Sequence, residues 1–185
     1  MPAAPRTARD TWITEGLRTL GVGGVDAVRI EKLAQALGVT KGGFYWHFQD
    51  RSALLDEMLD AWERLVVDEV IERVDADGGD PDERLRRLSK LASSSPALMG
   101  IELAVRDWAR RDDGVAARLR RVDNRRMAYL RSLFGAFASD EEDAEARCLL
   151  YYSLWLGNHF IAADHGGRRR GDVVKAALRL LGASA

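Results

Sequence analysis

Cysteine, long apolar runs and export signals are almost absent from this sequence. Its 185 residues include one cysteine, Cys148, so no disulfide can form within the chain. No stretch approaches the roughly 20 uninterrupted apolar residues of a membrane span, and the start lacks the apolar run of a signal peptide. We therefore expect a cytoplasmic protein that does not enter a membrane.

An excess of positive charge is also missing. The formal net charge is −1, and residues 1–50 hold six lysines and arginines against five aspartates and glutamates. A nucleic-acid-binding domain is usually strongly basic, so composition alone does not indicate one. If this end of the chain binds DNA, a few well-placed contacts must supply the affinity.

Recognisable catalytic motifs are missing as well. The three histidines (His47, His159 and His165) show no metal-ligand spacing, and the sequence contains neither a P-loop nor a nucleophile elbow. The glycines of residues 21–24 lack the full dinucleotide-binding pattern. We therefore expect no enzyme activity, no metal site and no cofactor.

Strand signals are scarce, whereas apolar residues recur at helical spacing along the whole chain. The pattern predicts an all-α fold of nine helices. The first ends at the glycines of residues 21–24, and the others begin near residues 30, 41, 51, 81, 96, 114, 140 and 172. Good starting residues support these positions: N-caps at Thr40 and Asp50, and first-turn prolines at Pro81 and Pro96.

The most informative segment covers residues 28–55. Two short predicted helices meet at a turn in which Gly38 supplies the backbone freedom that the turn requires. Ala34 is small where the helices approach, and Phe44 is apolar where the second must pack on the first. This pattern predicts a helix-turn-helix domain over residues 1–50 that presents its second helix to the DNA major groove. A larger helical domain follows over residues 51–185.

The second of these helices has an unusual composition for a purely structural element: Lys41, Gly42, Gly43, Tyr45, Trp46 and His47. Two adjacent glycines cost roughly 2 kcal/mol relative to alanines in a helix interior, a cost that is understandable where the backbone approaches another molecule. Lys41 can reach a phosphate or a guanine edge. Tyr45 and His47 can donate to phosphates, and Trp46 offers an apolar surface to a thymine methyl.

A structural alternative exists for the aromatic residues of this helix. Phe44 and Phe48 are expected in the core, and Tyr45 and Trp46 could pack inward with them. Exposure of Tyr45 and Trp46 would favour the DNA-binding interpretation.

The segment VTKGGFYWHFQDRSALL resembles the signature of the TetR family of bacterial regulators. It follows the family pattern of a small or hydroxyl residue, any residue, a glycine, two variable residues, an aromatic, any residue and His-Phe. The resemblance covers roughly residues 7–55, and beyond them only the helical architecture matches. It implies a repressor that a small molecule releases from its operator.

The resemblance also implies roles for single residues. Thr40 would cap the recognition helix and touch phosphate, Lys41 and Gly43 would face the groove, and Tyr45 and His47 would bind phosphate. Arg51 stands where the family often places a basic residue on the DNA backbone. Arg29 replaces the threonine that usually opens the family's second helix; an arginine can hold a phosphate but cannot cap, which leaves Asp26 as the cap.

Two helices of the second domain have the composition of an interface. Residues 140–163 are apolar almost without a break from Cys148 to Leu156, and a helix that is apolar on all sides must be buried on all sides. The last helix adds a further apolar face. We expect both helices to pair with their symmetry mates in a homodimer, as the resemblance also implies. The two recognition helices would then lie about 34 Å apart and read a near-palindromic operator.

The second domain is also rich in large apolar side chains that can enclose an effector. By resemblance, an apolar or aromatic effector binds there and tilts the helix of residues 51–74. The candidate contacts are Trp62, Met99, Leu103, Arg106, Met127, Trp155, Asn158 and His159. The alternative is that these side chains form an ordinary core, and Arg106 can instead pair with Glu102 four positions earlier.

A second class of function stays open. The near-neutral N-terminal domain is compatible with a helical small-molecule-binding or protein-interaction module whose helix-turn-helix does not engage DNA. The combination of Lys41, Tyr45 and His47 favours DNA binding over this alternative.

Overall fold

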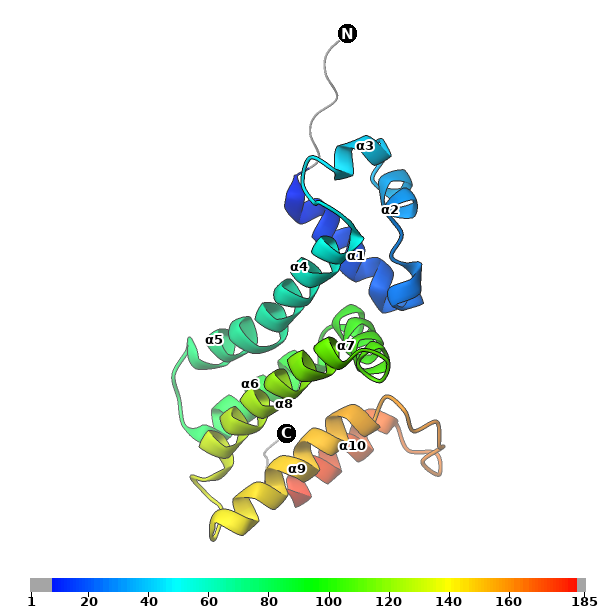
Figure 1. Cartoon of the computed structure of the whole chain (residues 1–185). Helices are drawn as coiled ribbons and strands as arrows, with labels where there is room; N and C mark the ends of the chain where they lie inside the picture. The colour runs from blue at the N-terminus through cyan, green and yellow to red at the C-terminus, as the bar shows by residue number, and fades with distance from the viewer. Residues whose placement is uncertain (1–7, 183–185) are drawn as a thin grey trace. The chain divides into compact units, whose positions relative to one another are not determined.

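The computed structural model describes residues 8–182 and contains no β-strand among them (Figure 1). The α-helices are α1 Arg9–Gly23, α2 Ile30–Ala36, α3 Lys41–Phe44, α4 Arg51–Glu63, α5 Glu69–Asp75, α6 Pro81–Ser93, α7 Pro96–Ala109, α8 Asp113–Phe134, α9 Glu141–Gly157 and α10 Arg170–Leu180. A 3₁₀ turn, Val25–Ala27, precedes α2, and a π-helical segment, Arg64–Asp68, joins α4 to α5 without a break. If α4, the π-helical segment and α5 are counted as one continuous helix, the described range contains nine helices. The predicted all-α fold is therefore confirmed.

Three helices with a side-chain cap begin where the sequence predicts a cap or a first-turn proline. The carboxylate of Asp50 accepts a hydrogen bond from the Ala53 N–H at 2.9 Å, and Asp80 forms a reciprocal capping box with Glu83 ahead of Pro81. Ser95, directly before Pro96, also caps its helix with its side chain, as do Asp112 before α8 and Asp140 before α9. These caps satisfy backbone donors that would otherwise lack partners at the helix ends.

The first helix ends within the predicted glycine cluster, at Gly23, so Gly21 still belongs to the helix. A Cβ atom on Gly21 would lie 3.0 Å from Ile101 Cγ1, and one on Gly100 would lie 3.0 Å from the Gly21 carbonyl oxygen. These glycines therefore allow the backbones of α1 and α7 to approach closely. The chain turns one residue later, at Gly24, whose φ of 71° suits glycine.

Two later helices are shorter at their C-terminal ends than predicted. Apolar spacing predicts helices up to residues 137 and 163, whereas α8 ends at Phe134 and α9 ends at Gly157. Both segments continue as hydrogen-bonded turns, since the Phe137 N–H donates to Phe134 and the Ile161 N–H donates to Gly157. Apolar spacing persists through such turns, which explains why the sequence overestimates the helices.

The chain forms two compact units, each with its own core. The first, here the N-terminal unit, comprises the described residues up to Asp68 together with Ser95–Val122. The second, the C-terminal unit, comprises Glu69–Ser94 and the described residues from Asp123 onward. The division predicted at residue 50 follows the expected DNA-binding role, whereas these units follow packing.

Aromatic side chains organise the core of the N-terminal unit. Trp12 and Phe44 are fully buried, and their rings meet edge to face with centroids 5.4 Å apart. Phe48 stacks on Phe44 with ring centroids 5.1 Å apart. Aromatic pairs of this kind add about 0.5–1.5 kcal/mol each beyond the burial of their area. Together they hold the short helix α3 against α1.

Two arginines fix the ends of α4 within the same unit. At its start, the Arg51 guanidinium donates to the carbonyls of Val28 and Val25, at 2.6 and 2.5 Å. Near its end, Arg118 of α8 donates to the carboxylates of Asp60 and Glu63, at 2.5 and 2.8 Å. Both ends of α4 are thus bonded to other segments of the unit.

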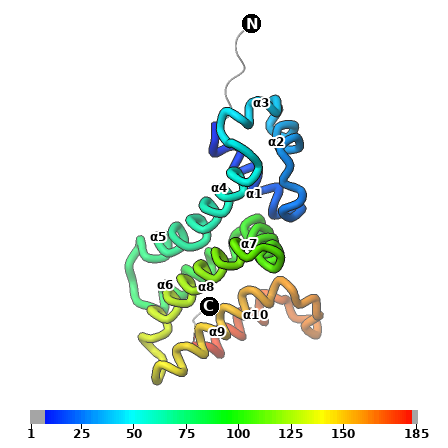
Figure 2. The backbone as a smooth tube through the Cα atoms, viewed as in Figure 1, coloured from blue at the N-terminus to red at the C-terminus, as the bar shows by residue number. Residues whose placement is uncertain are grey.

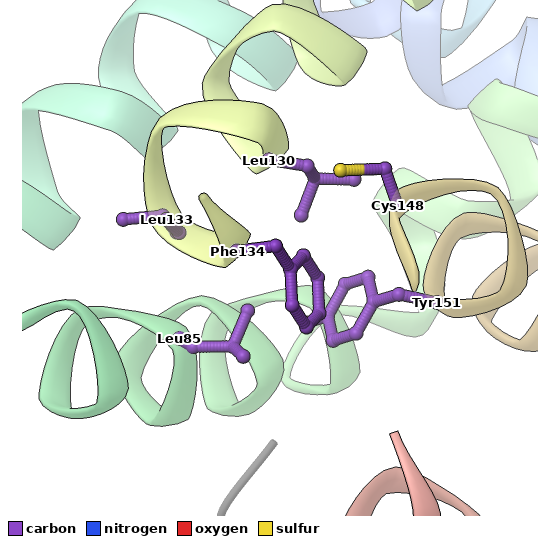
Figure 3. Close-up of a cluster of buried hydrophobic side chains, with 6 residues drawn as sticks. All are labelled: Leu85, Leu130, Leu133, Phe134, Cys148 and Tyr151. Atoms are coloured by element: carbon purple, nitrogen blue, oxygen red, sulfur yellow. The ribbon is translucent and has the colours of Figure 1, made fainter. Parts of the chain in front are cut away.

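The C-terminal unit is built around a second cluster of buried side chains: Leu85, Leu130, Leu133, Phe134, Cys148 and Tyr151 (Figure 3). Figure 2 shows α9 and α10 side by side within this unit. Arg147 near the start of α9 donates to the Leu181 carbonyl at 2.7 Å, and Arg170 at the start of α10 donates to the Asn158 carbonyl at 3.0 Å. The two helices are therefore antiparallel. No helix in the described part of the chain is long and apolar enough to span a bilayer.

Candidate nucleic-acid interface

The turn between α2 and α3 has the geometry of a helix-turn-helix. α2 ends at Ala36 with Leu37 as its C-cap, and Gly38 adopts a φ of 67°, as the predicted turn requires. The Val39 N–H then donates to the Ala34 carbonyl at 2.9 Å, which reverses the chain and brings Thr40 to the start of α3. Helices α2 and α3 are thus joined by a turn of a few residues.

The recognition helix is shorter than predicted. α3 spans only Lys41–Phe44, and the chain continues as a turn in which the His47 N–H donates to the Phe44 carbonyl at 2.9 Å. Thr40 occupies the predicted N-cap position, but its side chain makes no capping hydrogen bond, so this part of the prediction is wrong. The Gly43 N–H, a usual partner of such a cap, donates instead to the Thr40 backbone carbonyl at 2.9 Å.

Aromatic side chains alternate between the core and solvent along this segment. Phe44 and Phe48 are buried, whereas Tyr45 is 53% exposed and Trp46 is 75% exposed. His47 is half-buried beside them. The alternative in which Tyr45 and Trp46 pack inward therefore does not apply to this structure. An exposed tryptophan and tyrosine on one short segment suit contact with another molecule.

The two glycines of α3 have no packing role that the structure reveals. A Cβ atom on Gly43 would meet none of the described atoms within 4 Å, and one on Gly42 would meet only Thr40 Oγ1, at 3.7 Å. Neither residue has a positive φ. Neither packing nor backbone conformation therefore requires glycine at these two positions. Without side chains there, the backbone of α3 is accessible to a binding partner.

Lys41, the first residue of α3, forms an ion pair with Glu31 of α2. The Lys41 Nζ lies 2.5 Å from Glu31 Oε1, and both side chains are at least half exposed. The hydrogen bond with Glu31 raises the pKa of Lys41, and the same bond lowers the pKa of Glu31. Both groups are therefore charged at neutral pH. Sequence reasoning did not single out Glu31, because its link to Lys41 spans ten positions and appears only once the turn is folded.

The two arginines predicted to touch DNA lie in different environments. Arg29 is exposed at the N-cap position of α2, where its Nε donates to the Asp26 carbonyl at 3.1 Å. The cap predicted from Asp26 is wrong, since α2 has no side-chain cap. Asp26 lies in the 3₁₀ turn, and its carboxylate is 3.5 Å from Arg111. Arg51 donates to the carbonyls of Val25 and Val28, so in this structure it holds the segment before α2 against the start of α4.

The predicted effector contacts divide between the two units. Trp62, Met99, Leu103 and Arg106 belong to the N-terminal unit, and Met127, Trp155, Asn158 and His159 belong to the C-terminal unit. Among the first four, Trp62 is fully buried, and its indole N–H has no hydrogen-bond partner among the described residues; the Trp12 indole shares this property. Arg106 pairs with Glu102 at 2.9 Å, and the Glu102 carboxylate is buried, not at the surface.

The other four candidates are held by the C-terminal unit. The Trp155 indole donates to the Ala92 carbonyl at 3.3 Å, Asn158 binds Arg170, and Met127 packs on the core, whereas His159 is exposed. Two residues beside Trp155, Arg126 and Tyr152, were not among the predicted effector contacts. Arg126 lies over the Trp155 ring at 5.3 Å and donates to the Tyr152 hydroxyl at 2.8 Å.

Comparison with known proteins identifies the N-terminal part of the chain. Residues 13–58 match the sequence profile described as "Bacterial regulatory proteins, tetR family". The segment is 42% identical over 53 residues to the tetracycline repressor protein class G of Vibrio anguillarum, covering 29% of this chain and 25% of that protein. It is 35% identical over 72 residues to the HTH-type transcriptional regulator AcrR of Shigella flexneri, covering 39% of this chain and 34% of that protein. The chain thus matches about a quarter to a third of the length of these curated relatives.

Solved structures resemble the chain over nearly its whole length. A transcriptional regulator from Saccharomonospora viridis, crystallised with choline, has a TM-score of 0.78 at 17% identity and covers 94% of this chain and 95% of its own. Reduced NemR of Escherichia coli has a TM-score of 0.69 at 16% identity, with 94% coverage of both chains. At these identities the likeness establishes a shared fold.

The bonds of Arg51 generate a prediction about stability. Replacing Arg51 with alanine removes the donors to both carbonyls and should lower the free energy of unfolding by about 2 kcal/mol. Urea denaturation measures the loss. The control is Arg18→Ala, which removes an exposed arginine paired with Glu15 and should cost less than about 0.5 kcal/mol. If Arg51→Ala is as stable as the wild type but has lost affinity for DNA, Arg51 is a direct contact and not a support.

Proposed function

We propose that this chain, whose N-terminal domain is that of the TetR family of bacterial regulators, is a transcriptional repressor that binds DNA as a dimer and responds to a small-molecule effector. The observation that carries the proposal is the division of α3 and its following turn into a buried and an exposed side. Phe44 and Phe48 hold the segment in the core, while Lys41, Tyr45 and Trp46 extend outward. The names of the sequence relatives, a repressor and a regulator, agree with this role.

In the proposed complex, α3 enters the major groove of the operator. Lys41 binds a phosphate or a guanine edge, and Tyr45 and His47 donate to phosphates on either side. Trp46 contacts a thymine methyl or the sugar wall. Because Gly42 and Gly43 carry no side chains, the backbone of α3 can approach the duplex closely.

Three further residues complete the proposed interface. Thr40 and Arg29, both exposed, contact phosphates at the edge of the groove. Arg51 acts by positioning, since its bonds to Val25 and Val28 hold the segment before α2 against α4. The surface carries little excess charge, so affinity depends on a few directed contacts.

The dimer is proposed to form through α9 and α10. One side of α9 is buried through Cys148 and Tyr151, while Leu149 and Leu150 are more than half exposed. Leu180 of α10 is 87% exposed. Exposed leucines on antiparallel neighbouring helices match a two-fold, four-helix interface, in which each helix pair covers the other. Two-fold symmetry then predicts a near-palindromic operator.

The effector is proposed to be apolar or aromatic and to carry an oxygen that accepts a hydrogen bond. A buried indole N–H without a partner, as in Trp62, costs about 1–3 kcal/mol, and a ligand oxygen could recover that energy. The other proposed contacts in the N-terminal unit are Met99, Leu103 and Arg106. The candidates in the C-terminal unit, Met127, Trp155, Asn158 and His159, stay predictions from the sequence. The structural relative from S. viridis binds choline, so organic cations belong in the same screen.

This function places the protein in the cytoplasm and assigns it no catalytic role. The alternative, a helical binding module that does not engage DNA, has the near-neutral N-terminal region in its favour. A protein-interaction module would also expose Tyr45 and Trp46, but it does not need them beside a lysine and two adjacent glycines at the start of the second helix of a helix-turn-helix, so we favour the repressor.

Variants of the exposed surface test DNA binding. Lys41→Ala and Tyr45→Ala should each abolish a salt-sensitive gel shift with duplexes selected by the wild-type protein from a random pool, because each removes a direct contact with the DNA. Circular dichroism and sedimentation should show a folded dimer in both cases. Lys90→Ala, a matched change of an exposed lysine on α6, should leave the shift intact. An unchanged shift in both surface variants would refute this assignment.

A charge placed on α9 tests the dimer. Leu150→Glu should convert the wild-type dimer to a monomer at micromolar concentration, because the new carboxylate would be buried unpaired between the protomers. Light scattering coupled to size exclusion gives the mass. Val22→Glu introduces the same charge at a site on α1 that is 82% exposed, and it should remain dimeric. A Leu150→Glu variant that stays dimeric would place the interface elsewhere.

A screen tests the effector. Compounds with an apolar body and an acceptor oxygen, together with choline, should include one that raises the melting temperature and also releases DNA. Trp62→Phe should lower the affinity for that compound by about tenfold, the equivalent of one hydrogen bond. The affinity for an analogue without the oxygen should not change. The proposal is wrong if no stabilising compound weakens DNA binding.

A further inference from the structure

The Glu31–Lys41 ion pair places a carboxylate on the surface proposed to meet DNA. Glu31 is the second residue of α2 and Lys41 is the first of α3, so the pair bridges the two helices of the motif at 2.5 Å. The side chains are 64% and 50% exposed. Because both side chains are exposed, the ion pair can open, and Lys41 or Glu31 can then pair with another charged group.

Two further residues, one beside each helix, act on this pair. Arg29, the N-cap of α2, is a further cation acting on the Glu31 carboxylate, and Tyr45, the C-cap of α3, is a further group acting on Lys41. Both influences are smaller than that of the pair itself. In the free protein, Lys41 therefore already has an anionic partner before any phosphate arrives.

DNA offers two kinds of acceptor to an ammonium group. Phosphates are present at every position of any duplex, whereas the paired O6 and N7 acceptors of guanine lie in the groove only where the sequence provides them. A phosphate would have to replace Glu31 as the single anionic partner of Lys41, with little net gain. An operator base reached by a fully docked α3 adds acceptors at fixed positions, with the rest of the interface formed.

We propose that Glu31 is a specificity-determining residue, whose carboxylate keeps Lys41 from binding phosphate on random DNA and yields it only at the operator. The inference rests on the proposed DNA-binding function. It predicts that Glu31 lowers affinity for all DNA, but lowers affinity for non-operator DNA more.

The test is Glu31→Gln in the full chain, measured by fluorescence anisotropy over a series of salt concentrations. The two probes are a duplex selected by the wild type and a scrambled duplex of the same composition. For the scrambled duplex, affinity should rise about twofold to fivefold, the range of an exposed ion pair. Its plot of log K against log salt should steepen by about 0.9, the value for one added phosphate contact. For the selected duplex the slope should stay the same, so the specificity ratio should fall.

Two controls separate this effect from a change in net charge. Glu69→Gln removes another exposed carboxylate, paired with Arg73 at 2.7 Å on α5 of the C-terminal unit, and should leave both affinities unchanged. The double variant Glu31→Gln with Lys41→Met should lose the gain on scrambled DNA, because the gain depends on the released lysine. Thermal melts confirm that the variants are folded.

Each remaining outcome counts against a definite statement. If Glu31→Gln raises the affinity for both duplexes equally with parallel salt slopes, or changes neither affinity, the specificity role is wrong while DNA binding stands. If the gain survives in the double variant, Glu31 repels DNA without acting on Lys41, and the inference is again wrong. A wild-type chain that binds no duplex would overturn the proposed function and this inference together.

Discussion

The burial of Phe44, with its ring contacts to Trp12 and Phe48, is the interaction on which the proposed interface depends. A helix of a single turn cannot sustain itself, because forming the first turn costs more than its hydrogen bonds return. α3 also lacks a side-chain cap, so local hydrogen bonding adds little. A fully buried phenylalanine contributes about 1.5–3 kcal/mol, and its two ring contacts add to this. The position of every exposed group on α3 therefore follows from one side chain that points the other way.

The same arrangement explains how a near-neutral domain can be a credible DNA-binding domain. Its exposed surface does not rely on a broad positive field, which would attract any polyanion. It presents one lysine, already paired with Glu31, beside two aromatic side chains and a stretch of bare backbone. Such a surface has little to offer a duplex until several contacts form at once. Low charge then favours selectivity at the expense of affinity.

Much of this could be predicted from the sequence, for identifiable reasons. Helix starts were predictable because caps and prolines act locally, and Phe44 and Phe48 were predictable as core from apolar spacing. Interactions between distant segments were not. The close approach of Gly21 to Ile101 of α7 could not be predicted, and neither could the hydrogen bonds from Arg51 to the carbonyls of Val25 and Val28, because each joins residues far apart in the sequence. The Glu31–Lys41 pair belongs to the same class, since it needs the turn at Gly38 to exist. The effector contacts were chosen by residue type alone, and the structure divides them between two units.

The pinning of α4 by an arginine at each end has a mechanical consequence. A helix anchored at one end can swing and dissipate a disturbance through its free end. α4 has Arg51 tied to the carbonyls before α2, and it has Asp60 and Glu63 tied to Arg118 of α8. It is therefore coupled at both ends, so that a shift of α8 at Arg118 would act through α4 on the segment that precedes α2.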